Sequence, residues 1–295
     1  MTSDGRVPHP TAEPSRLAPV GDVARRRPAL RLSTRSAVAL SLVSVTGLMM
    51  FLWPLVLQPP DEFSHHSDAP FIFALILPGL IAVVLAELHS GRDGEAGMDT
   101  KALAMLGVLT AVGAALRPMG AGVAGIETVF FLLILAGRVY GPGFGFVLGS
   151  TTLFASALLT GGIGPWLPFQ MLASSWIGLG AGLLPRARGR AEIVLLAAYG
   201  IVAAYVYGFL LNMWFWPFSI GSDTQLSFVA GDAVFENLRR FFLFTVATST
   251  IGWDTGRAIT NTIAIVVLGP AVLAVLRRAT RRAAFDAPVE FEART

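Results

Sequence analysis

Long apolar segments separated by short polar connections set the strongest constraint on how this chain folds. A helix needs about 20 predominantly apolar residues to span a lipid bilayer. Eight segments of roughly this kind follow one another, at about 37–57, 69–88, 102–116, 126–140, 143–160, 167–184, 193–216 and 252–276. The sequence therefore predicts an all-α integral membrane protein with about eight transmembrane helices in a lipid bilayer.

Composition excludes several classes of function. Of the 295 residues, 54% are hydrophobic and only 14% are charged, against roughly 25% charged in a soluble domain. The chain has no room for a large soluble domain, so the membrane region must hold the function. There is no cysteine, which excludes disulfides, thiolate metal sites and cysteine nucleophiles. The four histidines lie in polar tails or connections, so we expect no catalytic or metal site built on His9, His65, His66 or His89.

The arginines are distributed unevenly and indicate the topology. They concentrate in residues 1–36, in the connection 185–192 and near the C-terminus at 277–282, whereas the connection 58–68 has no Lys or Arg. Positive residues that flank membrane spans mark the cytoplasmic side. We therefore expect a multi-pass protein of the cell membrane with both termini in the cytoplasm. The net charge of +3 then reflects topology and not nucleic-acid binding.

Glycines at a spacing of four follow the fourth apolar segment. Gly141, Gly145 and Gly149 surround a Gly-Pro-Gly turn. No strand precedes them and the GxGxxG spacing is absent, so a nucleotide-binding loop is excluded. The pattern predicts a tight turn and a small-residue stripe that lets two helices approach closely. Gly178 and Gly182 form a similar pair, which we also assign to internal packing.

The third apolar segment carries a second small-residue stripe. Gly107, Ala111 and Ala115 recur every four residues and give the helix one smooth face. Such a face either packs inside the bundle or docks another membrane protein. The sequence pattern alone leaves both interpretations open.

Polar and aromatic side chains gather toward the predicted outer half of the spans. The spacing of Asp254, Arg257 and Asn261 places all three on one helical face. Ionisable groups at membrane depth are costly and usually face a polar cavity, although an internal ion pair of Asp254 with Arg257 is the alternative. The tryptophans Trp53, Trp214 and Trp216 could belong to a site of this kind, or they could form an aromatic belt at the membrane interface.

Several of these segments resemble a known family. The matching strings are Arg117-Pro118, Gly125-Ile126-Glu127, the stretch 135–146 (LAGRVYGPGFGF) and the stretch 161–171 (GGIGPWLPFQM). They are similar to the substrate-binding S component of energy-coupling factor (ECF) vitamin transporters, in particular the branch linked to cobalamin or its precursors. The resemblance covers about residues 102–278, and its most specific part is the string GPW-x-P-x-QM.

The resemblance implies an architecture and a set of partners. A six-helix core, 102–278, would bind a vitamin near the outer face and release it after toppling in the membrane. The core would have no ATPase site of its own, and would work with a transmembrane coupling subunit and two ATP-binding subunits. Ala111 and Ala115 match the family's AxxxA contact with the coupling subunit, and Gly107 extends that stripe. Outside the core we expect two additional helices in 37–101, a disordered Arg- and Pro-rich cytoplasmic tail at 1–36 and a cytoplasmic C-terminal tail at 279–295.

We expect a ligand pocket closed by the connections 117–125, 161–166 and 217–251, although 241–250 could instead form an interfacial helix. Aromatic faces would hold a large flat ligand and a few polar groups would orient it. No cofactor or metal is expected. The expected binding residues are Arg117, Glu127, Trp166, Gln170, Trp176, Asn212, Trp253, Asp254, Arg257 and Asn261.

Other functions fit the sequence less well. An S component for another vitamin is the nearest alternative, because residue spacing does not identify the ligand. An intramembrane enzyme, such as a lipid-modifying transferase using Glu127, Asp254 or Arg257, would need a clustered acidic or histidine motif, which is absent. A purely structural membrane subunit would not need the convergence of polar groups. A secondary transporter would show internal repeats, and we find none.

Overall fold

Helices make up nearly all of the structure that can be described. The computed structural model describes residues 29–30, 32–56, 76–79, 81–83, 85–86, 98, 100–120, 125–219 and 224–283. Within these residues the β-type pairing is one isolated bridge, between Leu30 and Met98. The prediction of an all-α protein is confirmed.

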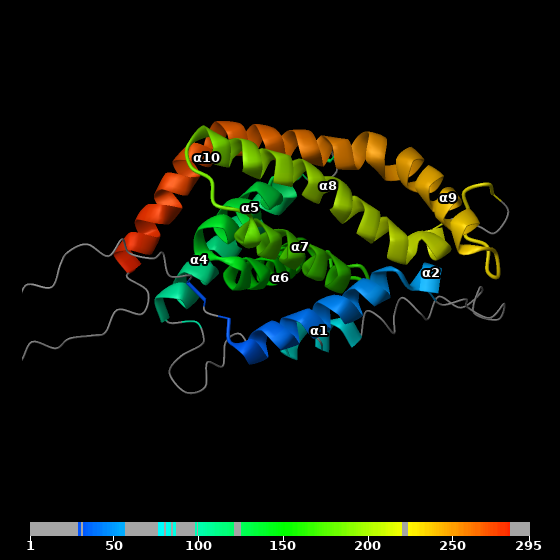
Figure 1. Ribbon diagram of the computed structural model, residues 1–295, viewed down its shortest axis with the longest axis horizontal. Coiled ribbons are helices and arrows are strands. Elements are labelled where there is room, and N and C mark those ends of the chain that lie inside the picture. The colour runs from blue at the N-terminus through cyan, green and yellow to red at the C-terminus, as the bar shows by residue number, and fades with distance from the viewer. Residues whose placement is uncertain are drawn as a thin grey trace, which may run out of the picture.

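The helices follow one another along the chain as Figure 1 shows. They are α1 (Thr34–Phe51), α2 (Trp53–Val56), α4 (Thr100–Leu116), the 3₁₀ turn η2 (Arg117–Gly120), α5 (Val129–Tyr140), α6 (Pro142–Thr160), α7 (Leu167–Leu183), α8 (Arg190–Ser219), α9 (Val234–Thr245), the π-helix η3 (Val246–Asp254) and α10 (Thr255–Ala283). Most of the predicted second segment, 69–88, lies outside the described residues, and its described parts, 76–79, 81–83 and 85–86, are helical.

Membrane-length helices account for most of the predicted spans. By length and composition, five described helices are long and apolar enough to cross a membrane. They are Thr34–Phe51, Thr100–Gly120, Pro142–Thr160, Arg190–Ser219 and Val234–Arg282.

The last of these helices differs from the prediction. We expected 217–251 to be an outer connection, but α9, η3 and α10 run together as one continuous helix, Val234–Arg282. The reason is that α9 is amphipathic: Phe241 is buried while Phe242 and Arg239 face outward. Charged residues on the outer face lower the apolar content of this stretch, so a search for apolar segments does not find it. Residues 241–250, the candidate interfacial helix, are an internal part of this long helix.

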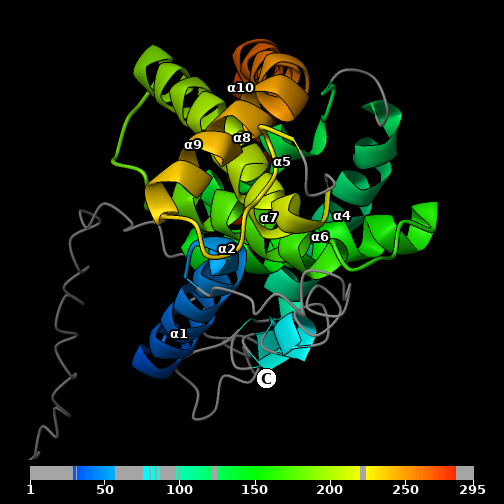
Figure 2. The same ribbon diagram turned by 90° about the vertical axis from the view of Figure 1, so that its right-hand side faces the viewer.

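Helix α5 lies at the centre of the bundle. Ten of its twelve residues are buried, and it contacts α4, α6, α7, α8 and α10. In the end-on view of Figure 2, α1 and α4 lie on different flanks around this centre. A helix of 12 residues spans about 18 Å, which is shorter than the roughly 30 Å hydrocarbon core. Residues 126–128, directly before α5, are not helical.

Close glycine contacts join α5, α6 and α7. A methyl group on Gly145 would overlap the carbonyl oxygen of Gly178, and one on Gly149 would overlap the backbone at Ser174. Gly182 lies equally close to the backbone of Pro142. The predicted small-residue packing is confirmed, because only hydrogen in place of a side chain permits this approach of the backbones.

Helix α1 packs on the outside of α7 and α8 through aromatic rings. Phe51 contacts Phe169, with ring centroids 5.1 Å apart, and Phe169 stacks on Trp214 at 4.2 Å. The indole nitrogen of Trp53 donates a hydrogen bond to the Trp214 carbonyl oxygen at 2.9 Å. Trp53, Trp214 and Trp216 are all buried. The interpretation of these three as an exposed interfacial belt is therefore wrong.

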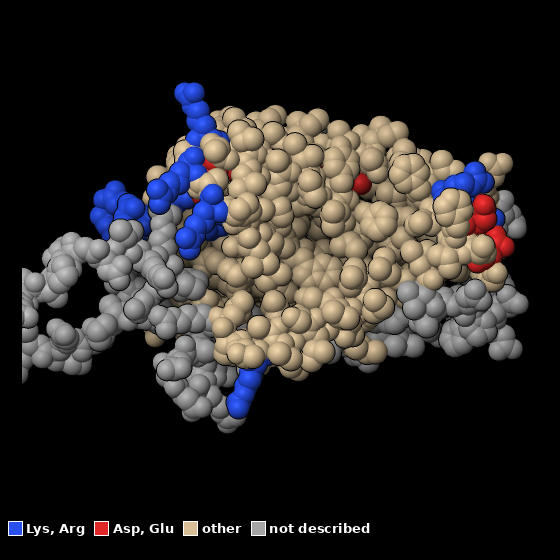
Figure 3. Space-filling view, viewed as in Figure 1, with Lys and Arg blue, Asp and Glu red and all other residues tan. Residues whose placement is uncertain are grey.

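Basic side chains gather at one end of the bundle, where α8 begins and α10 ends (Figure 3). We call this the arginine-rich end; its residues include Arg186, Arg188, Arg190, Arg277, Arg278, Arg281 and Arg282. Glu192, which is buried, accepts from Arg138 at 2.9 Å and from Arg277 at 2.7 Å, and so ties α5, α8 and α10 together there. The prediction of disorder is wrong for the end of the tail: Ala29 and Leu30 are buried, and the Ala29 amide donates to the Tyr140 carbonyl oxygen at 3.0 Å.

Helix α4 turns its small-residue stripe outward. Gly107, Ala111 and Ala115 are exposed, whereas Leu106 and Leu109 face the bundle. A side chain added at Gly107 would meet open space. Internal packing is therefore wrong for this stripe.

We predict that replacing Gly178 with valine separates α6 from α7. The branched side chain would collide with the backbone of α6, and overpacking of this kind costs about 1–3 kcal/mol or more. The apparent melting temperature of the purified protein should fall. Gly107→Val, at a position where an added side chain meets open space, is the matched control and should not lower it. A Gly178→Val variant that melts with the wild type would contradict this account of the helix contact.

Candidate functional site

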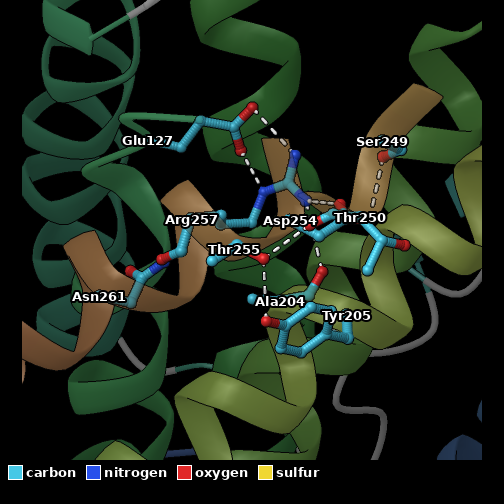
Figure 4. Close-up of polar contacts among 9 residues, drawn as sticks. All are labelled: Glu127, Ala204, Tyr205, Ser249, Thr250, Asp254, Thr255, Arg257 and Asn261. Atoms are coloured by element: carbon cyan, nitrogen blue, oxygen red, sulfur yellow. Dashed lines mark hydrogen bonds and ion pairs between the residues drawn. The ribbon is translucent and has the colours of Figure 1, made fainter. Parts of the chain in front are cut away.

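A buried arginine joins three helices and one non-helical segment at the centre of the candidate site. The Arg257 guanidinium donates through Nε to Glu127 Oε2 at 2.8 Å and through Nη1 to Asp254 Oδ1 at 2.8 Å. Nη1 also donates to the Ala204 carbonyl oxygen of α8 at 3.3 Å. Figure 4 shows the guanidinium between the two carboxylates. The Arg257 side chain is 7% exposed, so its charge is neutralised inside the protein and not by bulk water.

Aromatic rings complete the surroundings of this arginine. The guanidinium carbon lies 4.8 Å from the ring centroid of Tyr207 and 5.6 Å from that of Phe130. A cation over an aromatic face is stabilised by the ring quadrupole. Arg257 is therefore held on several sides, and its orientation is well defined.

Glycines permit the close approach that the ion pairs require. Gly125 has a φ of +76° and lies against the Trp253 carbonyl oxygen, where a side chain would overlap the backbone. This places the non-helical segment before α5, which carries Glu127, directly beside η3. Gly208 on α8 leaves room for the Asp254 carboxylate in the same way. Non-helical backbone at membrane depth is tolerated where it is buried in protein or lines a cavity.

The π-helix η3 adds a residue to the cluster that the sequence analysis missed. Ser249 donates its hydroxyl proton to Asp254 Oδ2 at 2.9 Å, and Thr255 donates to the Thr250 carbonyl oxygen at 2.6 Å. Both pairs are five residues apart, which is the hydrogen-bond spacing of a π-helix. An α-helical periodicity does not bring residues five apart together, so no signal in the sequence pointed to Ser249. Short π-helical stretches inside α-helices are frequent at functional sites.

A pocket of about 520 Å³ lies beside this cluster. It is at the end of the bundle opposite the arginine-rich end, because it touches the start of α7 and the ends of α8 and α9. This volume is within the range of roughly 300–1,000 Å³ typical of small-molecule sites. The residues lining it are Glu127, Gln170, Tyr207, Gly208, Leu211, Asn212, Ser219, Phe244, Thr248, Ser249, Trp253 and Arg257.

Half of the expected binding residues lie in the pocket wall. They come from the segment before α5, from α7, α8, η3 and α10, and they are Glu127, Gln170, Asn212, Trp253 and Arg257. Asp254, Arg257 and Asn261 were predicted to share one helical face, and they do contact one another. Arg257 donates to Asp254, and Asn261 donates to the Arg257 carbonyl oxygen at 2.8 Å. Asp254 and Arg257 do form the internal ion pair that was the alternative, while Arg257 also faces the pocket.

The other five expected residues lie outside the pocket wall. Asp254 and Asn261 are buried beneath Arg257. Arg117 is not a lining residue, but its Nη2 donates to Oε1 of Gln170, which is one, at 2.8 Å. Trp176 points to α1, where its indole nitrogen donates to Ser44 Oγ at 3.0 Å. Trp166 is 44% exposed and lies over Gly164. Both tryptophans are outside the pocket because of the direction of their side chains, which the sequence did not reveal.

The pocket also contains residues that the sequence analysis did not select. Tyr207, Leu211 and Phe244 supply apolar and aromatic surface, and Ser219, Thr248 and Ser249 supply hydroxyl groups. Within the described residues there is no group of three or more His, Asp or Glu side chains that could hold a metal ion. The arrangement suits the capture of a small molecule with both apolar and polar parts.

Comparison with known proteins identifies the family. The family model described as "ECF transporter, substrate-specific component" matches residues 101–276, which include every residue lining the pocket. No curated protein and no solved structure matches the chain. Members of the family are membrane substrate-binding subunits of ECF importers; they are transport subunits that act with a transmembrane coupling subunit and ATPases, and they are not enzymes. The chain, a multi-pass membrane protein, belongs to the substrate-specific component family of ECF transporters.

Proposed function

We propose that this protein captures a vitamin or vitamin precursor at the outer face of the cell membrane and delivers it inward with its ECF partners. The pocket of about 520 Å³ carries the proposal, because it combines aromatic surface with polar groups inside the part of the chain that matches the family. Cobalamin or a related corrinoid is the ligand class that the sequence resemblance favours.

The charge distribution supports this orientation. The arginine-rich end would lie in the cytoplasm by the positive-inside rule, and both termini would lie there too. The pocket at the opposite end then opens to the outside. The chain at 117–120 and 161–166 would act as lids, since Gly161 adopts a φ of +67° at the end of α6 and offers a hinge. In this scheme α9 and η3 form the helical third side of the entrance, in place of the loop expected from the sequence.

The exposed stripe of α4 supports a docking role. Gly107, Ala111 and Ala115 present a smooth surface on a helix whose other face packs in the bundle. Small residues let a second helix approach closely in a membrane. We propose that the coupling subunit contacts this stripe, and that 37–101 and the two tails lie outside the six-helix core.

We expect Asn212→Leu to weaken ligand binding without weakening the fold. The Asn212 side-chain nitrogen is buried in the pocket wall and has no hydrogen-bond partner in the protein. Removing an unsatisfied buried amide is neutral or stabilising, whereas losing a hydrogen bond to the ligand costs about 1 kcal/mol or more. Affinity should fall about tenfold in a binding screen of the purified protein against vitamins, with an unchanged or higher melting temperature.

Asn261→Leu is the matched control for Asn212→Leu. Asn261 bonds to the backbone of Arg257 outside the pocket wall, so its loss should lower the melting temperature. If the protein binds no vitamin or precursor in the screen, the proposed function is wrong. If Asn212→Leu binds as tightly as wild type, the ligand does not occupy this pocket.

Replacing Ala111 with tryptophan should uncouple the protein from its motor. The large ring would stand on the exposed stripe of α4 and keep a second helix at a distance. We expect unchanged ligand affinity and melting temperature, but loss of co-purification with the coupling subunit and at least a tenfold loss of vitamin uptake. Leu42→Trp, at an exposed position on α1, should retain both. Normal uptake by the Ala111→Trp variant would exclude the stripe as the docking face.

A further inference from the structure

We propose that the ligand carries an anionic group, a carboxylate or a phosphate, and that Arg117 binds it. This inference rests on the proposed function, because it names the ligand class of the same pocket. Its starting point is a contrast among arginines. Three other arginines away from the arginine-rich end make ion pairs with carboxylates: Arg239 with Glu236, Arg240 with Asp232, and Arg257 with Glu127 and Asp254.

Arg117 makes no such pair within the described residues. Its side chain bonds to one group, the amide oxygen of Gln170, at 2.8 Å. A guanidinium has five N–H donors, so most of its hydrogen-bonding capacity is open. Arg117 is also partly buried, so bulk water solvates its charge only in part. A ligand oxyanion would supply the missing partner.

The backbone holds Arg117 beside the pocket. It is the first residue of η2, directly after Leu116, whose carbonyl oxygen accepts a hydrogen bond from Thr128 Oγ1 at 2.8 Å. Thr128 follows Glu127, which lines the pocket. This bond links the end of α4 to the start of α5 and keeps Arg117 close to the part of the pocket wall that Glu127 forms.

Two side-chain amides in the pocket wall add further N–H donors to those of Arg117. A guanidinium can only donate, so the Gln170 atom that it contacts must be the oxygen, and the Gln170 nitrogen is left as a donor. The Asn212 nitrogen, on α8, is a buried donor without a protein partner. Arg117, Gln170 and Asn212 together offer donors from three elements. An oxyanion, which only accepts, fits this set, and charge-assisted hydrogen bonds are the strong ones.

The Arg257 cluster offers an anionic ligand no free positive charge. There Arg257 is bound by two carboxylates, those of Glu127 and Asp254, so this cluster holds one surplus negative charge. Both Glu127 oxygens already accept from Arg257, at 2.8 and 3.3 Å. Charges interact strongly where the effective dielectric constant is low. The anionic group is therefore disfavoured beside this cluster and is bound by Arg117, while Leu211 and Phe244 supply apolar contact in the pocket.

The test compares acids with uncharged analogues of nearly equal size. The full-length protein, purified into lipid nanodiscs, is titrated by calorimetry with pantothenate and pantothenyl alcohol, biotin and biotin amide, pyridoxal phosphate and pyridoxal, and cobyrinic acid and its amidated corrinoid. Cyanocobalamin and thiamine serve as a neutral and a cationic probe. We expect an acid or phosphate to bind about 10- to 100-fold more tightly than its uncharged analogue, which is the effect of hydrogen bonds to a charged group.

Variants assign this preference to Arg117. Arg117→Gln should abolish the preference for the anion while retaining the weaker affinity for the uncharged analogue, which shows that the pocket is still folded. Arg117→Lys, which keeps the charge but not the fork geometry, should retain part of the preference. Arg239→Gln removes a charge from the exposed face of α9 and is the matched control, with wild-type affinities expected.

The outcomes separate the two proposals. Tight binding of a neutral or cationic probe with no gain for any acid overturns the anion inference and leaves vitamin capture standing. An anion preference that persists in Arg117→Gln at the level of Arg239→Gln also overturns it. If none of the probes binds, vitamin capture itself fails, and the anion inference fails with it.

Discussion

The Arg257 guanidinium is the interaction on which the rest of the site depends. It links the segment before α5, the helix α8, the π-helix η3 and α10 through Glu127, Ala204 and Asp254. In an apolar bundle a charge of this kind is tolerated only with partners at hydrogen-bonding distance, and removing one partner leaves an uncompensated buried charge. The cluster therefore fixes the relative positions of four elements, and the pocket forms along its open side.

Close backbone contacts at glycines make this cluster and the rest of the bundle possible. Gly125 and Gly208 give space for Trp253 and Asp254, and the Gly145 contact with Gly178 keeps α6 and α7 together. Without a hydrophobic driving force between helices in lipid, such close packing supplies much of the association energy. At the arginine-rich end, buried Glu192 performs a similar linking role with Arg138 and Arg277. Polar links thus close the bundle at both ends.

The additional N-terminal helix has a defined structural position. Helix α1 covers α7 and α8 through Phe51, Phe169 and Trp214, and Trp176 bonds to Ser44. This is a different flank from α4, whose stripe stays exposed (Figure 2). The arrangement leaves the proposed docking surface free. It also turns Trp176 away from the pocket, so this tryptophan joins α7 to α1 and does not line the pocket.

Local spacing in the sequence determined the helical membrane architecture, the glycine packing and the shared face of Asp254, Arg257 and Asn261. The family resemblance came from matching residue strings. Half of the expected site residues line the pocket, because they were chosen where polar and aromatic groups gather at the outer ends of several segments. Only the tertiary structure decided the rest. A π-helix changes the helical repeat and pairs Ser249 with Asp254. The charged face of the amphipathic α9 lowers its mean hydropathy, so the helix is not found as an apolar segment. The directions of Trp166 and Trp176 follow from what packs against them. These features depend on neighbours distant along the chain, which local spacing does not encode.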